Sequence, residues 1–124
     1  MPLEKEEITK EIIGAAYEVY NSLGYGFLEK VYQNAMIVEL RLRALEASAE
    51  QVIQVYFKDQ MVGDYKADLV VKGVIVELKV AQNYRSSDEP QLLNELKATR
   101  TSVGLLINFG REKVEFKRFI SSTK

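Results

Sequence analysis

The hydrophobic positions in the first third of the chain recur at helical spacing. Between residues 4 and 23 they lie three or four residues apart, at Ile8, Ile12, Ala15, Ala16, Val19 and Leu23. This is the pattern of one buried helix face. Gly24 interrupts it, and a second pattern of the same period runs from Leu28 to Leu45. We therefore expect two helices joined by a short turn.

After Ala49 the pattern changes to alternating or continuous β-branched residues, which is typical of strands. The segments that carry it are residues 50–57, 62–71, 74–81, 103–109 and 113–120. Glu89-Pro90 begins another helical pattern that runs to residue 99, since proline is favoured in the first turn of a helix. The order α-α-β-β-β-α-β-β predicts one α/β domain over residues 1–124, with a mixed sheet flanked by helices.

The second and third strands read as a hairpin around the two-residue turn Lys72-Gly73. Counting outwards from that turn places Asp68 directly opposite Glu77. One face of the hairpin is then expected to be a core wall, made of Tyr65, Ala67, Leu69, Val71, Val74, Val76, Leu78 and Val80. The other face is expected to carry Lys66, Asp68, Val70, Ile75, Glu77 and Lys79.

Two carboxylates in directly opposed positions repel one another, so something must compensate their charge. One arrangement is a divalent cation bridged by Asp68 and Glu77, with Lys79 beside them to steady a water or a phosphoryl group. The other is an ion-pair cluster in which Lys66 and Lys79 neutralise the acids, and it is the commoner of the two on geometry alone.

Composition restricts the chemistry further, because the chain contains no Cys, His or Trp. Thiolate nucleophiles, histidine-based triads and ordinary zinc sites are excluded, so any metal should be a hard ion such as Mg²⁺ or Mn²⁺. The apolar runs are shorter than the roughly 20 residues of a membrane span. The first 12 residues are too acidic for a secretory signal. We expect a cytoplasmic protein without a membrane partner.

The charge is unevenly distributed along the chain. Residues 1–96 carry 10 basic and 16 acidic side chains, whereas residues 97–124 carry 7 basic and 2 acidic ones. The C-terminal part is therefore a candidate phosphate-binding surface. Its candidate residues are Lys97, Arg100, Arg111, Lys113, Lys117 and Arg118. No aromatic-rich segment predicts a stacking platform for single-stranded nucleic acid.

Several motifs together resemble the GxxExxY protein family, which is placed in the PD-(D/E)XK nuclease-like superfamily. The motif that names the family is Gly26-Phe27-Leu28-Glu29-Lys30-Val31-Tyr32. The other matching segments, in the family's order, are Asp68, Glu77-Leu78-Lys79, Gln91-Leu92-Leu93-Asn94 and residues 103–110. The resemblance extends from about Ile8 to Ile120.

The resemblance implies a restriction-endonuclease-like α-β-β-β-α-β core, here with an extra N-terminal helix and a C-terminal strand. It also implies a Mg²⁺- or Mn²⁺-dependent phosphodiesterase site. Asp68, Glu77 and the carbonyl of Leu78 would bind the metal, Lys79 would assist the attacking water, and Glu29 would complete the site through a water on the metal. Gln91 would position substrate or that water. The expected partner is nucleic acid, DNA rather than RNA, and a homodimer is left open.

The chain departs from the family pattern at two positions. Glu95 lies where a tyrosine is usual, and Asp88 lies where histidine is common. Because an added negative charge opposes phosphate binding, two alternatives to a nuclease stay open. One is a non-catalytic module that binds nucleic acid or protein, and the other is a small structural or dimerising α/β protein.

Overall fold

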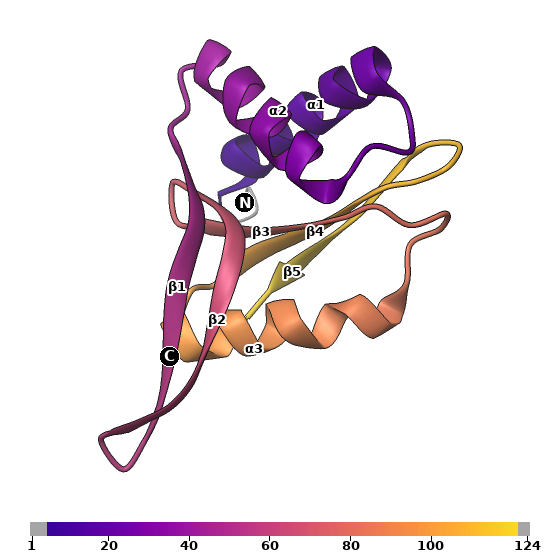
Figure 1. Ribbon diagram of the computed structural model, residues 1–124. Helices are drawn as coiled ribbons and strands as arrows, with labels where there is room; N and C mark the ends of the chain where they lie inside the picture. The colour runs from indigo at the N-terminus through magenta and orange to yellow at the C-terminus, as the bar shows by residue number, and fades with distance from the viewer. Residues whose placement is uncertain (1–4, 122–124) are drawn as a thin grey trace.

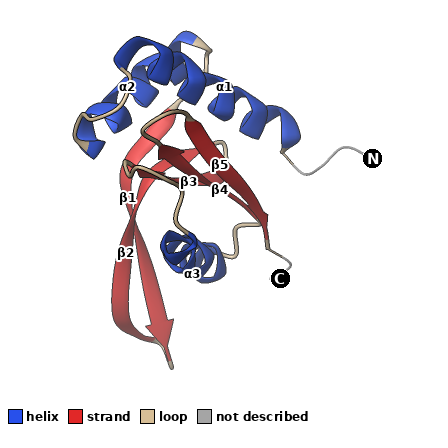
Figure 2. Cartoon of the chain, turned by 90° about the vertical axis from the view of Figure 1, so that its right-hand side faces the viewer, coloured by secondary structure: helices blue, strands red, loops and turns tan. Residues whose placement is uncertain are grey.

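The computed structural model describes residues 5–121. It contains a five-stranded sheet of order β1-β2-β3-β4-β5, formed by Ala47–Phe57, Gln60–Val71, Val74–Lys79, Val103–Phe109 and Val114–Ile120. Only β3 and β4 are parallel. Helices α1 (Glu6–Leu23) and α2 (Glu29–Leu42) cover one face, and α3 (Glu89–Thr99) covers the other (Figure 1, Figure 2). The predicted mixed α/β fold is therefore confirmed.

The predicted elements differ from the structure mainly at their ends. The first strand begins at Ala47 instead of residue 50, and a single 3₁₀ turn, η1 (Ser86–Asp88), lies within the expected loop. The third strand ends at Lys79 instead of residue 81, because the Asn108 side chain both accepts from the Ala81 amide and donates to its carbonyl. The expected helix start at Glu4 lies outside the described residues.

The larger hydrophobic core lies between α1, α2 and the sheet. Tyr32 is fully buried in this core, where its ring stacks on Phe109 with 4.4 Å between centroids. The hydroxyl of Tyr32 donates to the carbonyl of Gly24, the residue that ends α1 with a φ of 70°. This contact fixes the α1–α2 connection and therefore the position of Glu29, the first residue of α2.

A second core packs α3 against the opposite sheet face. It contains Ile53, Ala67, Ile75, Leu92, Leu96 and Leu106, with Tyr65 and Val70 packed against it. The assignment of Tyr65 and Ala67 to the same face as Leu69 is thus wrong. The strands lose regular pairing between Leu69 and Ala67, where Glu50 on β1 has a φ of 54°. This distortion turns the outer half of β2 toward α3.

Candidate active site

Asp68 and Glu77 meet where β2 and β3 separate. The two strands pair at Val71–Val74, Val70–Ile75 and Leu69–Val76, which is the register that the two-residue turn predicted. Beyond Leu69–Val76, the carboxylates of Asp68 and Glu77 take the place of backbone carbonyls as hydrogen-bond acceptors between the two strands. Leu78 N–H donates to Asp68 Oδ2 at 2.8 Å, and Asp68 N–H donates to Glu77 Oε2 at 3.4 Å. Side chains are thus held between two diverging strands.

Gln91, in the first turn of α3, connects the sheet to the helix. Its Nε2 donates to Glu77 Oε1 at 3.3 Å and to Glu95 Oε2 at 3.1 Å. Both carboxylates are buried, Glu77 with 2% and Glu95 with 0% of its surface exposed. The amide therefore bridges two acids that would otherwise repel each other at close range.

The protonation of this buried pair is strongly perturbed. Burial raises the pKa of Glu77 to about 11, and the hydrogen bond with Glu95 and the charge of Asp68 act in the same direction. Burial also raises the pKa of Glu95, whereas its hydrogen bonds with Glu77 and Gln91 lower it. Burial thus favours the neutral form of both acids, and most strongly that of Glu77.

Glu95 is the site residue that the sequence did not assign. Within the described residues 5–121, its Oε1 is a buried oxygen without a hydrogen-bond partner. The signal was its spacing: position 95 follows Gln91 by four residues and lies between Leu92 and Leu96, so it shares the helix face that packs on the sheet. A carboxylate on that face is unexpected, because buried charges are costly unless they are paired.

Glu29 and Lys79 approach the acid pair from two sides. Partial desolvation raises the pKa of Glu29, the charge of Asp68 raises it further, and Lys79 opposes this. Lys79 is half-buried at the end of β3. Across residues 5–121, no cation lies within 4 Å of Asp68 or Glu77, and Lys79 makes no ion pair of that length. Lys66 and Lys79 thus form no ion pair with Asp68 or Glu77 in these residues, although the charge of Lys79 acts to lower the pKa of Glu29 and of Glu95.

Asp68 and Glu77 present carboxylate oxygens, the ligands that a hard divalent cation prefers, and neither forms an ion pair within residues 5–121. No three acidic side chains in the described part of the chain surround a common point that could hold an ion. A cation here would accordingly have Asp68 and Glu77 as carboxylate ligands, which is the usual number for Mg²⁺. The Leu78 side chain is aliphatic and has no donor atom, so only its backbone carbonyl can contribute.

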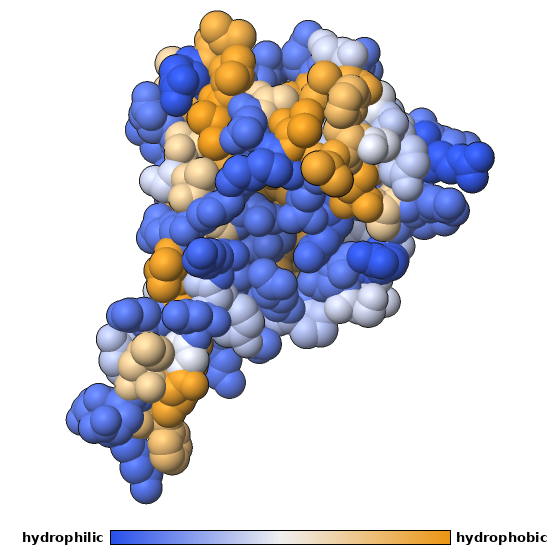
Figure 3. All heavy atoms as spheres, viewed as in Figure 1, coloured by the Kyte–Doolittle hydropathy of each residue, from blue (hydrophilic) through white to orange (hydrophobic). Residues whose placement is uncertain are grey.

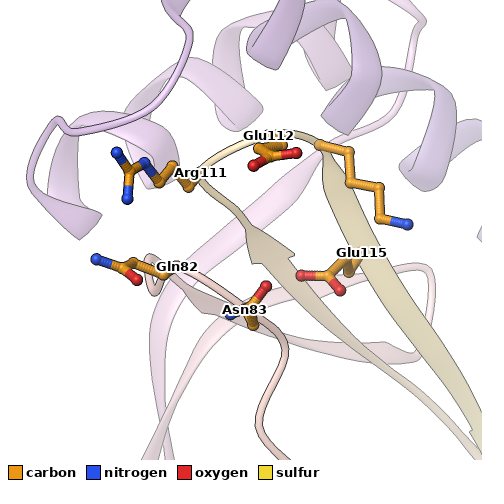
Figure 4. A pocket seen from close by; sticks show the side chains of 6 residues that line it. Gln82, Asn83, Arg111, Glu112 and Glu115 are labelled. Carbon is orange, nitrogen blue, oxygen red and sulfur yellow. The ribbon is translucent and has the colours of Figure 1, made fainter.

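The predicted basic residues divide between two places. Lys97 and Arg100 line a cavity of about 540 Å³ between α3 and the β1–β2 hairpin. Arg111 and Lys113 line a separate cavity of about 200 Å³ beyond the carboxyl end of β3, together with Gln82, Asn83, Glu112 and Glu115 (Figure 4). Two further cations have other partners: Lys117 pairs with Glu89, and Arg118 donates to Thr9 Oγ1.

Comparison with known proteins gives one family. The family model described as the PD-(D/E)XK nuclease superfamily matches residues 6–119. The crystal structure of SSO0001 resembles the chain with a TM-score of 0.61 at 15% identity, covering 98% of this chain. The chain spans 61% of the length of that protein, and the likeness concerns the fold alone. No curated protein matched. Among the described residues, no helix has the length and apolar character needed to cross a membrane.

Proposed function

Because the chain belongs to the PD-(D/E)XK nuclease superfamily, we propose that it is a metal-dependent nuclease that hydrolyses phosphodiester bonds. One observation carries the proposal. Asp68 and Glu77 lie together where β2 and β3 diverge. Lys79 follows Glu77 by two residues on β3, and it forms no ion pair with either acid. Two acids can hold a cation, and an amine beside them can stabilise the negative charge that develops on a phosphoryl group during hydrolysis.

Mg²⁺ or Mn²⁺ is the cofactor in this proposal, and when bound it would polarise the phosphate and lower the pKa of a water. Asp68, Glu77 and the Leu78 carbonyl would hold it. Lys79 would orient the attacking water and stabilise the negative charge that develops on the phosphoryl oxygens. Glu29, whose pKa responds to both Asp68 and Lys79, lies within electrostatic reach to accept a proton from that water.

Gln91 has a positioning role in the same proposal. Its amide contacts Glu77 and Glu95 at once, so it fixes the direction in which the Glu77 carboxylate points. Glu77 must release its proton before it can bind a cation, because metal ligands bind in their deprotonated form. Gln91 remains available to the ionised carboxylate as a hydrogen-bond donor.

Within the superfamily we assign the chain to the GxxExxY family, with DNA rather than RNA as its substrate. The assignment rests on residues Gly26 to Tyr32, which have separate roles in the fold. The GxxExxY tyrosine, Tyr32, is buried and bonded to Gly24, while the glutamate, Glu29, lies near Asp68. The motif thus supports the α1–α2 turn and presents one acid toward the site.

The proposal predicts metal-dependent cleavage that requires Lys79. Labelled single-stranded DNA, duplex DNA, branched DNA and RNA would be incubated with Mn²⁺ and either the wild type or Lys79→Ala. Loss of one catalytic group should lower the cleavage rate by about 10²–10⁴-fold. Lys66→Ala is the matched control, since Lys66 is an exposed lysine on the neighbouring strand. Equal rates for wild type and Lys79→Ala would contradict the assignment.

A second candidate is a binding module that keeps the nuclease fold without catalysis. The observation that favours it is the bridge from Glu77 through Gln91 to Glu95, which satisfies most of the buried acidic oxygens without any cation. The same substrate panel separates the two functions. A preparation that binds one substrate and cuts none at any Mn²⁺ concentration would support the module.

A further inference from the structure

The β1–β2 hairpin projects beyond the body of the molecule (Figure 1). A groove lies between this hairpin and α3. The cavity of about 540 Å³ in this groove is lined by Val55, Tyr56, Tyr65, Asn94, Lys97, Ala98 and Arg100. Its lining residues include two tyrosines, two cations and one amide, and none is acidic. Such a surface complements a ligand that has flat aromatic groups and negative charge.

A β-bulge at Val62 on β2 lies opposite the aromatic wall of the groove. Consecutive strand residues normally point to opposite faces, yet Val55 and Tyr56 line the same cavity. The register of β1 against β2 shifts between these two residues, from Val55–Gly63 to Tyr56–Met61. A bulge of this kind re-aims a side chain. Tyr56 lies beside this bulge and lines the groove with 58% of its surface exposed, and its hydroxyl donates to Gln54 Oε1 at 2.8 Å.

The opposite wall is positively charged. Lys97 and Arg100 lie on the last turn of α3 and at its C-cap, and both are exposed. Across residues 5–121, neither takes part in an ion pair shorter than 4 Å. Their charge is therefore available to a phosphate group, unlike that of Lys117, which pairs with Glu89.

Two elements, β2 and α3, contribute residues both to the groove and to the acid pair. Tyr65 precedes Asp68 by three residues on β2, a distance of about 10 Å along a strand. Asn94 precedes the buried Glu95 on α3, and its Nδ2 donates to the Tyr65 hydroxyl at 3.2 Å. Figure 3 shows hydrophilic side chains across the face between the hairpin and α3, with hydrophobic ones on the hairpin itself. A nucleic acid in the groove would thus reach the site within a few nucleotides.

We propose that this groove binds single-stranded nucleic acid, with bases stacked on Tyr56 and Tyr65 and phosphates held by Lys97 and Arg100. The proposal deepens the proposed nuclease function and rests on it for the identity of the ligand. Base stacking on an aromatic ring requires an unpaired base, because the faces of duplex bases are already covered. The structure thereby supplies the stacking platform that the sequence did not predict, from two tyrosines nine residues apart.

Binding would be measured by fluorescence anisotropy in EDTA, so that cleavage plays no part. The probes are a labelled 12-nucleotide single strand, as DNA and as RNA, and a duplex of the same sequence. Wild type should prefer a single strand. Tyr56→Ala should weaken that binding about tenfold, since one stacked base contributes about 1–3 kcal/mol. Tyr56→Phe should bind like wild type because it keeps the ring.

The contribution of Lys97 and Arg100 is tested by the salt dependence of binding. Replacing Lys97 and Arg100 together by alanine should reduce the slope of log affinity against log salt by about 1.4, the value for two phosphate contacts on a single strand. The matched controls are Tyr17→Ala and Lys10→Ala on α1, an exposed aromatic and an exposed cation away from the groove. Both should bind like wild type.

The outcomes separate this inference from the nuclease proposal. The groove proposal is overturned if the duplex binds more tightly than the single strand, or if Tyr56→Ala binds with wild-type affinity. Neither result bears on metal-dependent cleavage, which is tested by Lys79→Ala. Absence of binding to every probe also overturns it. Tyr56-dependent binding of a single strand in EDTA, with no cleavage of that strand when Mn²⁺ is supplied, supports the groove and contradicts the nuclease proposal.

Discussion

Glu95 places a second buried carboxylate against Glu77. Neither acid has a cation within 4 Å in the described chain, and one oxygen of Glu95 has no partner. Because burial raises the pKa of Glu77, the native state favours the protonated form of this acid more than the unfolded chain does. This is a local cost in the native state, and it has a measurable pH dependence.

The folding stability of the metal-free protein should fall as the pH rises above about 4.5. The native pKa of Glu77 is raised from 4.5 to about 11, so the native state binds one more proton than the unfolded state across that window. Stability from this source is complete below the unfolded pKa and is lost as pH rises toward the native one. Urea unfolding in EDTA between pH 5 and 9 would measure it.

Glu95→Gln should flatten this profile. The glutamine removes one buried charge and can donate to Glu77, so the free energy of unfolding at pH 8 should increase by about 1–3 kcal/mol, the cost of an unsatisfied buried group. Near pH 4 the difference should vanish. Glu112→Gln, an exposed acid on the β4–β5 turn, is the control. A slope in Glu95→Gln equal to that of wild type would refute the assignment of this pair.

The β2–β3 hairpin is the element that the sequence described best. Lys72 and Gly73 both have positive φ, 49° and 81°, as a two-residue hairpin turn requires, so counting from them gave the correct register. The same counting failed for Tyr65 and Ala67, because a distortion opposite Glu50 cannot be seen in the alternation of residue types. Glu95 was missed for a related reason: only the packed structure shows what lies opposite a helix face.

The contact between α3 and β4 should be sensitive to one added methyl group. A Cβ on Gly104 would lie 2.9 Å from Leu92 Cδ1 and 3.2 Å from Leu96 Cδ1. Both leucines are fully buried and lie on α3, the helix that also contains Gln91 and Glu95. Gly104→Ala should therefore lower the free energy of unfolding by about 1–3 kcal/mol. Gly63→Ala is the control, since a Cβ there meets no atom within 4 Å. Similar losses in both variants would contradict this packing argument.

The whole molecule holds its candidate site among three layers. Glu29 comes from the helices on one sheet face, Asp68, Glu77 and Lys79 come from the sheet, and Gln91 comes from the helix on the other face. An ion that binds these residues in the native state, and not in the unfolded state, must raise the free energy of unfolding. Thermal unfolding therefore reports on the site without requiring a substrate.

Addition of Mg²⁺ or Mn²⁺ should raise the melting temperature of the wild type. At one hundred times the dissociation constant the stabilisation should be about 2.7 kcal/mol. Glu77→Gln should abolish the rise, because it removes a proposed ligand, whereas Glu112→Gln should retain it. The effect should grow with pH, since the cation competes with the proton on Glu77. Equal responses in both variants would remove Glu77 from the ligand set.

The arrangement of the strands also orders the assembly of these residues in time. Asp68 and Glu77 belong to one hairpin and are nine residues apart, whereas the pairing of β3 with β4 needs the whole α3 crossover in between. Short loops close at a smaller entropic cost than long ones. We therefore expect Asp68 and Glu77 to meet when the hairpin forms, and the segment bearing Gln91 and Glu95 to pack against them later.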